Sequence, residues 1–170
     1  MSSLVGNASV RVGTKSGVYT RSMSASHYTY DTTHMCGGSA SIISPTQFRD
    51  PGYIYTAVLD ELKAATRYFY VFGSDEEWSE EHSFVTSADD KDTPFQFVMY
   101  GDQGTYSNAF PVIAGVESIL DEIELVLHVG DLSNAWGNGY TWEMWSNMIA
   151  NVASTVPYMV NQINKKFTNQ

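Results

Sequence analysis

The chain has 170 residues, a formal net charge of −10 at neutral pH and a pI of about 4.6. Apolar residues make up 43% and charged residues 16%, which predicts a packed globular fold and excludes a disordered chain. The acidic balance excludes nucleic acid and anionic membrane surfaces as partners, because such a chain would not displace counterions from a phosphate backbone. It does not exclude phosphate-ester chemistry, since bound metal cations reverse the local sign of the charge.

Cysteine content and the N-terminus say little about the compartment. Cys36 is the single cysteine, so no internal disulfide forms; we expect a buried, unreactive thiol, with an intermolecular bridge as the alternative. No run approaches the ~18 apolar residues of a membrane span, and no apolar segment follows a basic start as in a signal peptide. Asn7 begins an Asn-Ala-Ser glycosylation sequon, which has meaning only in a secretory setting and is read here as a chance occurrence.

The first half of the chain, residues 1–86, is typical of short strands separated by turns. The expected strands are Ala8–Val12, Tyr53–Leu59, Arg67–Phe72 and His82–Val85. Their spacing predicts an antiparallel β-sandwich. About seven strands complete such a sandwich and this stretch offers fewer, so we expect it to lack the first strands. Residues 87–94 are polar and acidic and end in proline, which predicts a linker.

The second half, residues 95–170, has a different pattern. Three apolar runs, Phe95–Tyr100, Leu125–Val129 and Val156–Val160, alternate with stretches in which apolar residues recur at helical spacing. The helical stretches span 110–120 and 142–152. This strand–helix–strand–helix–strand order predicts a parallel sheet with right-handed crossovers.

Two of these strands each end in a Gly-Asp pair. Asp102 and Asp131 are 131 − 102 = 29 positions apart, which is the length of one βαβ unit. Open α/β sheets bind ligands at the carboxyl ends of their strands. Two carboxylates placed there repel each other unless a cation lies between them, so both are candidate metal ligands. Gly-Asp turns after strands are also common in proteins without metals, and that alternative stays open.

The surrounding residues carry a family resemblance. In the second half the segments concerned are Tyr100–Gly104, Leu127–Ser133, Trp142–Trp145 and Val156–Val160. In the first half they are Met35–Gly38, Phe48–Ile54 and Trp78–Phe84. Together, and in this order, these segments resemble the purple acid phosphatases. The resemblance implies an α+β two-domain chain: a partial fibronectin-III-like β-sandwich over 1–86, incomplete at its start, a linker over 87–94, and the first, truncated βαβαβ part of a metallophosphoesterase α/β sandwich over 95–170.

The resemblance also implies a chemistry. The family uses a dinuclear site, ferric iron beside zinc, manganese or ferrous iron, and hydrolyses phosphate monoesters at acid pH. By position, Asp102 would bind the first metal and Asp131 would bridge both. Such a pair lowers the pKa of a bound water, which attacks phosphorus in line. The family is mostly secreted, vacuolar or lysosomal, although this chain shows no signal peptide, and a homodimer is one option for its assembly.

The departures from the family pattern concern the remaining ligands. Asn134 stands where the family has its tyrosine ligand, so the charge-transfer partner of ferric iron is missing. Asn164 keeps the ligand position for the second metal. Lys165 replaces the family's histidine and Lys166 an acidic residue, which places two ammonium groups beside the expected metals. The sequence therefore predicts no intact set of catalytic residues.

Three functional hypotheses follow. The family's later histidine motifs would lie beyond Gln170, so Asp102, Asp131 and Asn164 are too few to hold two ions firmly. The first hypothesis is an acid phosphatase-like hydrolase that needs further parts for turnover. The second is a non-catalytic remnant of one, and the third is a binding module that uses the sandwich half.

Other conspicuous side chains are expected to be structural. His128 lies inside an apolar strand, so we expect a hydrogen-bonded core histidine, and we expect Trp142 and Trp145 to pack in the core. Apolar side chains of the incomplete sheet should be left uncovered, namely Val98, Leu127 and Val129.

Overall fold

The structure is a computed structural model that describes residues 4 and 6–161. The chain divides into two compact units, Met1–Pro94 and Phe95–Gln170. Each unit has its own sheets, and each is described by itself.

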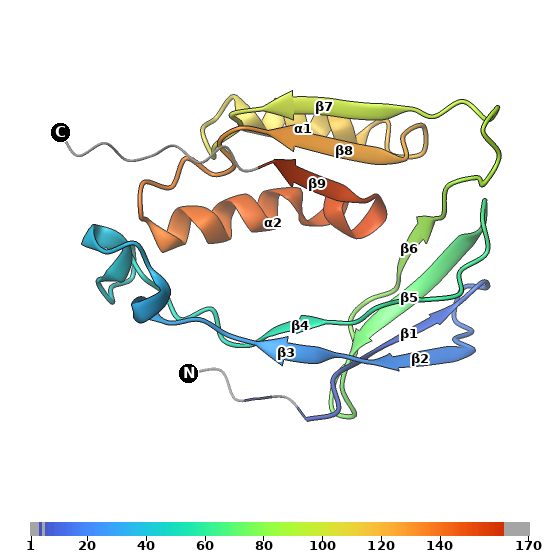
Figure 1. The fold of residues 1–170 in the computed structure, drawn as a ribbon, viewed down its shortest axis with the longest axis horizontal. Helices are drawn as coiled ribbons and strands as arrows, with labels where there is room; N and C mark the ends of the chain where they lie inside the picture. Colours follow the sequence, from blue (N-terminus) through green and yellow to red (C-terminus); the bar gives the residue numbers. More distant parts are fainter. Residues whose placement is uncertain (1–3, 5, 162–170) are drawn as a thin grey trace. The chain divides into compact units, whose positions relative to one another are not determined.

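The N-terminal unit is built from antiparallel strands (Figure 1). Its elements in chain order are β1 (Ser9–Gly13), β2 (Arg21–Ser24), β3 (Ser26–Tyr28), the 3₁₀ turns η1 (Thr32–His34) and η2 (Gly38–Ser41), β4 (Ile54–Thr56), β5 (Arg67–Gly73) and β6 (His82–Val85). A four-stranded sheet has the order β2-β1-β5-β6, and β3 and β4 form a separate two-stranded sheet. The strands predicted near residues 8, 67 and 82 are therefore confirmed, and the one predicted over 53–59 is shorter.

β2 and β3 were not predicted from the sequence. Neither strand alternates apolar and polar residues, and each holds its conformation by pairing, β2 with β1 and β3 with β4. The sheet itself is held by apolar contacts on β5, where Tyr68 is buried and its ring stacks on Phe84 at 5.7 Å. Val12 on β1 is fully buried. The short strands thus depend on their partners, which a single-strand pattern does not reveal.

The Glu81 carboxylate links the β1–β2 turn to the segment that precedes β6 by hydrogen bonds. Glu81 accepts hydrogen bonds from the Ser16 hydroxyl at 2.6 Å, the Gly17 backbone N–H at 2.7 Å and the Tyr19 hydroxyl at 2.7 Å. These donors lower the pKa of Glu81 below its ordinary value of 4.5, because they favour the ionised carboxylate, and the Ser16 hydrogen bond has the largest effect. The ionised form of Glu81 is therefore part of the folded structure.

This contact makes the stability of the N-terminal unit depend on pH. A carboxyl group whose pKa is lower in the folded chain stabilises the fold above its unfolded-state pKa, and that stabilisation is lost as the pH falls through the folded value. We expect Glu81→Gln to lower the midpoint of thermal unfolding at pH 7. The difference in midpoint between the variant and the wild type should become smaller toward pH 3. Glu80→Gln, an exposed neighbour, is the control. A difference in midpoint that is the same at both pH values would contradict the expectation.

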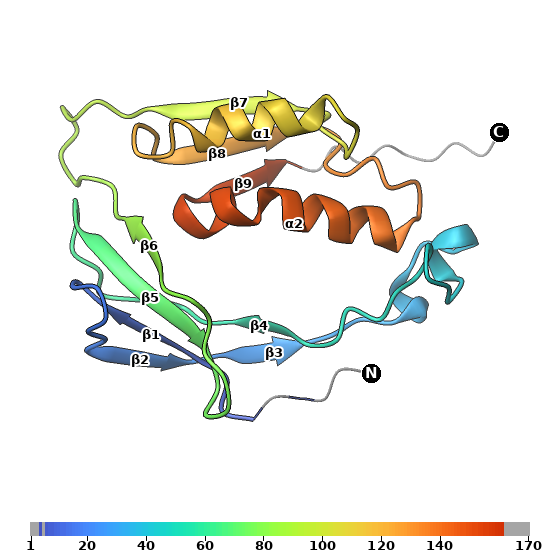
Figure 2. The ribbon, with the colours of Figure 1, turned by 180° about the vertical axis from the view of Figure 1, so that it is seen from behind.

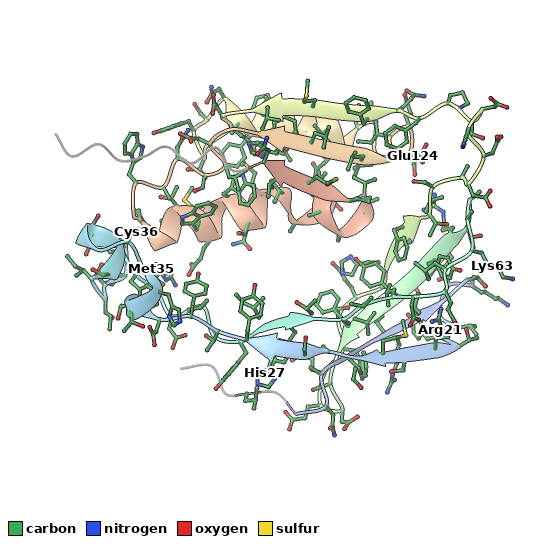
Figure 3. All side chains as sticks on the ribbon, viewed as in Figure 1. Arg21, His27, Met35, Cys36, Lys63 and Glu124 are labelled. Carbon is green, nitrogen blue, oxygen red and sulfur yellow. The ribbon has the colours of Figure 1, made fainter. Side chains whose placement is uncertain are left out.

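The prediction of a buried thiol is wrong. Cys36 is exposed, in the turn segment between η1 and η2 (Figure 3). This segment consists of 3₁₀ turns and bends, and neither η1 nor η2 has a buried residue. The Cys36 side chain therefore has no core to pack into and stays exposed to solvent.

The C-terminal unit is a parallel three-stranded sheet with two helices on one face. Its elements are β7 (Phe97–Gly101), α1 (Ala109–Glu117), β8 (Leu125–Val129), α2 (Gly139–Thr155) and β9 (Tyr158–Asn161), with the strand order β7-β8-β9. Figure 2 shows both helices in front of the strands. The predicted strand–helix alternation is confirmed, and β8 has the predicted bounds. Among the described residues, neither α-helix has the length and apolar character needed to cross a bilayer.

The core of this unit lies between the helices and the sheet. Its buried members are Ile113, Val116, Ile123, Val126, Trp145, Ile149, Val152 and Val156. α2 starts at a cap, because the Asn138 side chain accepts a hydrogen bond from the Thr141 backbone N–H. The helices thereby fix one face of the sheet, and with it the loops that follow β7 and β8.

The opposite face of the sheet is apolar and largely uncovered within the described residues. Its exposed members are Phe97, Met99, Val129 and Met159, and Leu127 is half-buried. The expectation is confirmed for Val129, holds only in part for the half-buried Leu127, and is wrong for Val98. Because side chains alternate along a strand, Val98 points to the helices and packs against their core.

Candidate metal centre

The two Gly-Asp pairs meet at the carboxyl edge of the sheet. β7 and β8 run in parallel with Gly101 opposite Val129, so the turns that follow them are neighbours. The Asp131 backbone N–H donates to Asp102 Oδ1 at 2.8 Å, and the Asp102 N–H donates to the Val129 carbonyl at 3.3 Å. The predicted juxtaposition is therefore present. One oxygen of Asp102 is already engaged by backbone.

Glycine is required on both sides of this contact. A Cβ on Gly101 would lie 2.2 Å from the Val129 carbonyl oxygen, and one on Gly130 would lie 2.4 Å from Asp102 Oδ1. Gly130 also has φ +86°, a left-handed conformation that favours glycine. Asp102 has φ +50°, which aspartate adopts more readily than most other residues. The close approach of the two turns therefore depends on the absence of side chains at these glycines.

Gln103 also lies at this edge of the sheet, and its burial was not predicted from the sequence. It follows Asp102, is buried, and accepts a hydrogen bond at 3.0 Å from Trp145 Nε1 on α2. Trp145 packs in the core as predicted, but Trp142 is 46% exposed and its prediction is wrong. Trp142 lies one turn before Trp145 on the same side of α2, near the start of the helix, and its ring packs edge-on against that of Trp145 at 5.9 Å while the rest of it stays exposed. A polar residue next to a turn carries no sequence signal of burial, so Gln103 could be found only from the structure.

His128 is a buried, hydrogen-bonded core histidine, as predicted. Its Nδ1 lies 2.7 Å from the Tyr158 hydroxyl, which in turn lies 2.6 Å from the Tyr100 hydroxyl. Burial lowers the pKa of His128, while the nearby Asp131 backbone and Asp102 charge work in the opposite direction. The imidazole is therefore neutral near pH 7. Burial raises the pKa of Tyr100 and of Tyr158, so both hydroxyls keep their protons.

Asn134 lies in the loop after β8, half-buried, with φ +52°. Its amide Nδ2 would be 2.9 Å from a Cβ on Gly104, so its side chain reaches the loop after β7. Asn164 and Lys165 lie outside the described residues. Asn7, the sequon residue, is exposed, and its amide nitrogen donates to Asp75 at 3.1 Å.

The donor set of the described residues does not fit a dinuclear metal centre. Among residues 4 and 6–161, no three His, Cys, Asp or Glu side chains lie close enough together to hold a metal ion. Two carboxylates at one sheet edge, with one oxygen of Asp102 engaged by a backbone N–H, are fewer ligands than one tetrahedral site requires.

Comparison with known proteins shows which family the chain is related to. A family model described as the purple acid phosphatase N-terminal domain matches residues 2–86, half of the chain. The chain belongs to the purple acid phosphatase family. A purple acid phosphatase from yellow lupin (Lupinus luteus) seeds has the same fold, with a TM-score of 0.82 and 31% identity over 93% of this chain. This likeness confirms the predicted fold class, a fibronectin-III-like β unit followed by the start of the catalytic α/β domain.

Two relatives from Arabidopsis thaliana differ in what their names say of activity. The protein named Probable inactive purple acid phosphatase 9 is 35% identical over 77% of this chain. The protein named Fe(3+)-Zn(2+) purple acid phosphatase 12 is 28% identical over 64% of it. The chain spans 22% and 24% of these relatives and 30% of the lupin protein. The chain therefore corresponds to the N-terminal part of the family's proteins.

Proposed function

We propose that this chain supplies the first ligands, in sequence order, of a dinuclear metal centre that hydrolyses phosphate monoesters. The single observation that carries the proposal is the contact of the two Gly-Asp turns, in which the Asp131 N–H binds Asp102 Oδ1. This contact places two carboxylates at the sheet edge where α/β enzymes bind ligands. Iron with zinc as the metal pair is supported by the name of one Arabidopsis relative.

The described residues do not complete such a centre, so the proposal includes a lack of turnover by these residues alone. Asn134 offers a neutral amide where the family has a phenolate, which weakens any ferric site. Asn164, as the third ligand, and Lys165, in place of the family's histidine, belong to the same proposal.

A second candidate is a non-catalytic role in which the turns are kept for folding only. The Asp102–Asp131 contact supports it, because it satisfies a backbone N–H without any metal. The name of the Probable inactive relative also supports it.

Metal binding by the purified chain separates the two candidates. The chain is prepared without a chelating tag, titrated with Zn²⁺ or Mn²⁺ by calorimetry, and assayed with p-nitrophenyl phosphate. The proposal expects weak binding that Asp131→Asn abolishes and Asp92→Asn, a change in the linker, preserves, with no hydrolysis by either variant. No binding at millimolar metal would overturn the proposal and favour the non-catalytic role. Turnover by the wild-type chain would overturn the incomplete-centre part.

A further inference from the structure

Three hydrogen-bonding side chains cross the sheet just before the two Gly-Asp turns. Tyr100 on β7 precedes Asp102 by two residues, and His128 on β8 precedes Asp131 by three. Tyr158 on β9 joins them, with its hydroxyl 2.6 Å from the Tyr100 hydroxyl and 2.7 Å from His128 Nδ1. Each strand of the sheet thus contributes one member of this Tyr100–Tyr158–His128 chain.

The protons of this chain can be arranged in two ways. In the first, Tyr100 donates to Tyr158 and Tyr158 donates to Nδ1 of His128, which leaves the imidazole proton on Nε2. In the second, Nδ1 donates to Tyr158 and Tyr158 donates to Tyr100, which leaves the Tyr100 proton without an acceptor. The second also leaves Nε2 as a bare buried acceptor. The first arrangement leaves one group without a partner, the Nε2–H, and the second leaves two. Buried polar groups without partners cost free energy, so the first arrangement is the better one.

Nε2 has no partner among the described residues in either arrangement. His128 is fully buried, and within the described part of the chain its Nε2 makes no hydrogen bond of normal geometry. Its ring lies 5.9 Å from that of Trp145, whose Nε1 donates to Gln103, the residue after Asp102. His128 itself precedes Asp131 by three residues along the chain, so it is linked to the segments that carry both turns.

We propose that Tyr158 fixes His128 as the neutral Nε2–H tautomer, and that His128 is a positioning residue for the Asp131 turn. Its imidazole packs on Trp145, which binds Gln103 beside Asp102, and the Asp131 N–H that follows on the chain of β8 holds Asp102 Oδ1. An aliphatic side chain would fill the same space without a buried polar atom, so packing alone does not explain a histidine here. The relevance of this support to a metal centre rests on the proposed function.

The tautomer can be read in the unmodified full chain. In a two-bond ¹H–¹⁵N correlation spectrum, the two ring nitrogens of a histidine show which one carries the proton. The other histidines are His27, His34 and His82, and the signal lost in His128→Asn identifies the fourth. We expect a protonated Nε2 and an unprotonated Nδ1. A protonated Nδ1, or the averaged signal of an exchanging imidazole, would overturn the proposal.

The positioning role is read from the Asp131 backbone amide. Tyr158→Phe removes the hydroxyl that fixes the tautomer, and we expect a mixed tautomer signal and about tenfold faster hydrogen exchange at the Asp131 N–H. Tyr140→Phe, at an exposed position on α2, is the matched control and should change neither. An unchanged Asp131 exchange rate beside an altered tautomer would overturn the positioning role. Both readouts are made without metal, so their failure is distinct from a failure of metal binding.

Discussion

Replacing Trp145 with alanine is expected to lower the free energy of unfolding of the C-terminal unit by about 3–5 kcal/mol, the usual cost of truncating a large buried aromatic side chain. Trp145 is buried in the core between the helices and the sheet. Its Nε1 donates to Gln103, and its ring lies 5.9 Å from that of His128 and 6.1 Å from that of Tyr158. The substitution therefore removes packing and leaves the buried Gln103 Oε1 without its donor.

Hydrogen exchange of the β8 amides measures this effect in the C-terminal unit alone, which matters because two units need not unfold together. Trp136→Ala is the matched control, since Trp136 is 79% exposed. Its effect should stay within about 0.5 kcal/mol. If both variants lowered protection equally, Trp145 would not be the packing centre that the structure indicates.

The parts of the candidate site that depend on residues close in sequence could be predicted. Gly-Asp after an apolar run places Asp102 and Asp131 at strand ends, and the one-unit separation makes the strands neighbours. His128 was recognisable as a core residue because apolar residues surround it in the sequence. These inferences need only strand periodicity and the rules for parallel sheets.

What could not be predicted depends on partners distant in sequence. Gln103 is buried because Trp145, 42 positions later, donates to it. Tyr158 and His128 meet because β9 pairs with β8, and no spacing within either strand predicts that contact. The exposure of Cys36 likewise reflects a segment with no core beneath it, while its residue type alone favours burial.

The two turns themselves give the last large expected effect. Gly130→Ala would place a Cβ 2.4 Å from Asp102 Oδ1 at a φ of +86°. The left-handed backbone costs about 1–2 kcal/mol for alanine, and loss of the N–H bond to the carboxylate adds about 1.5–3 kcal/mol. We therefore expect the free energy of unfolding of the C-terminal unit to fall by about 2.5–5 kcal/mol, with weaker binding of any added Zn²⁺.

The same substitution at Gly115 is the control and should have the opposite sign. Gly115 lies within α1, is exposed, and has no atom within 4 Å of an added Cβ. Alanine is favoured over glycine there by about 1 kcal/mol, so Gly115→Ala should stabilise the unit. Both variants are compared by hydrogen exchange of the β8 amides. If Gly130→Ala were as stable as wild type, the two turns could separate without cost, and the Asp102–Asp131 contact could not be what organises this edge of the sheet.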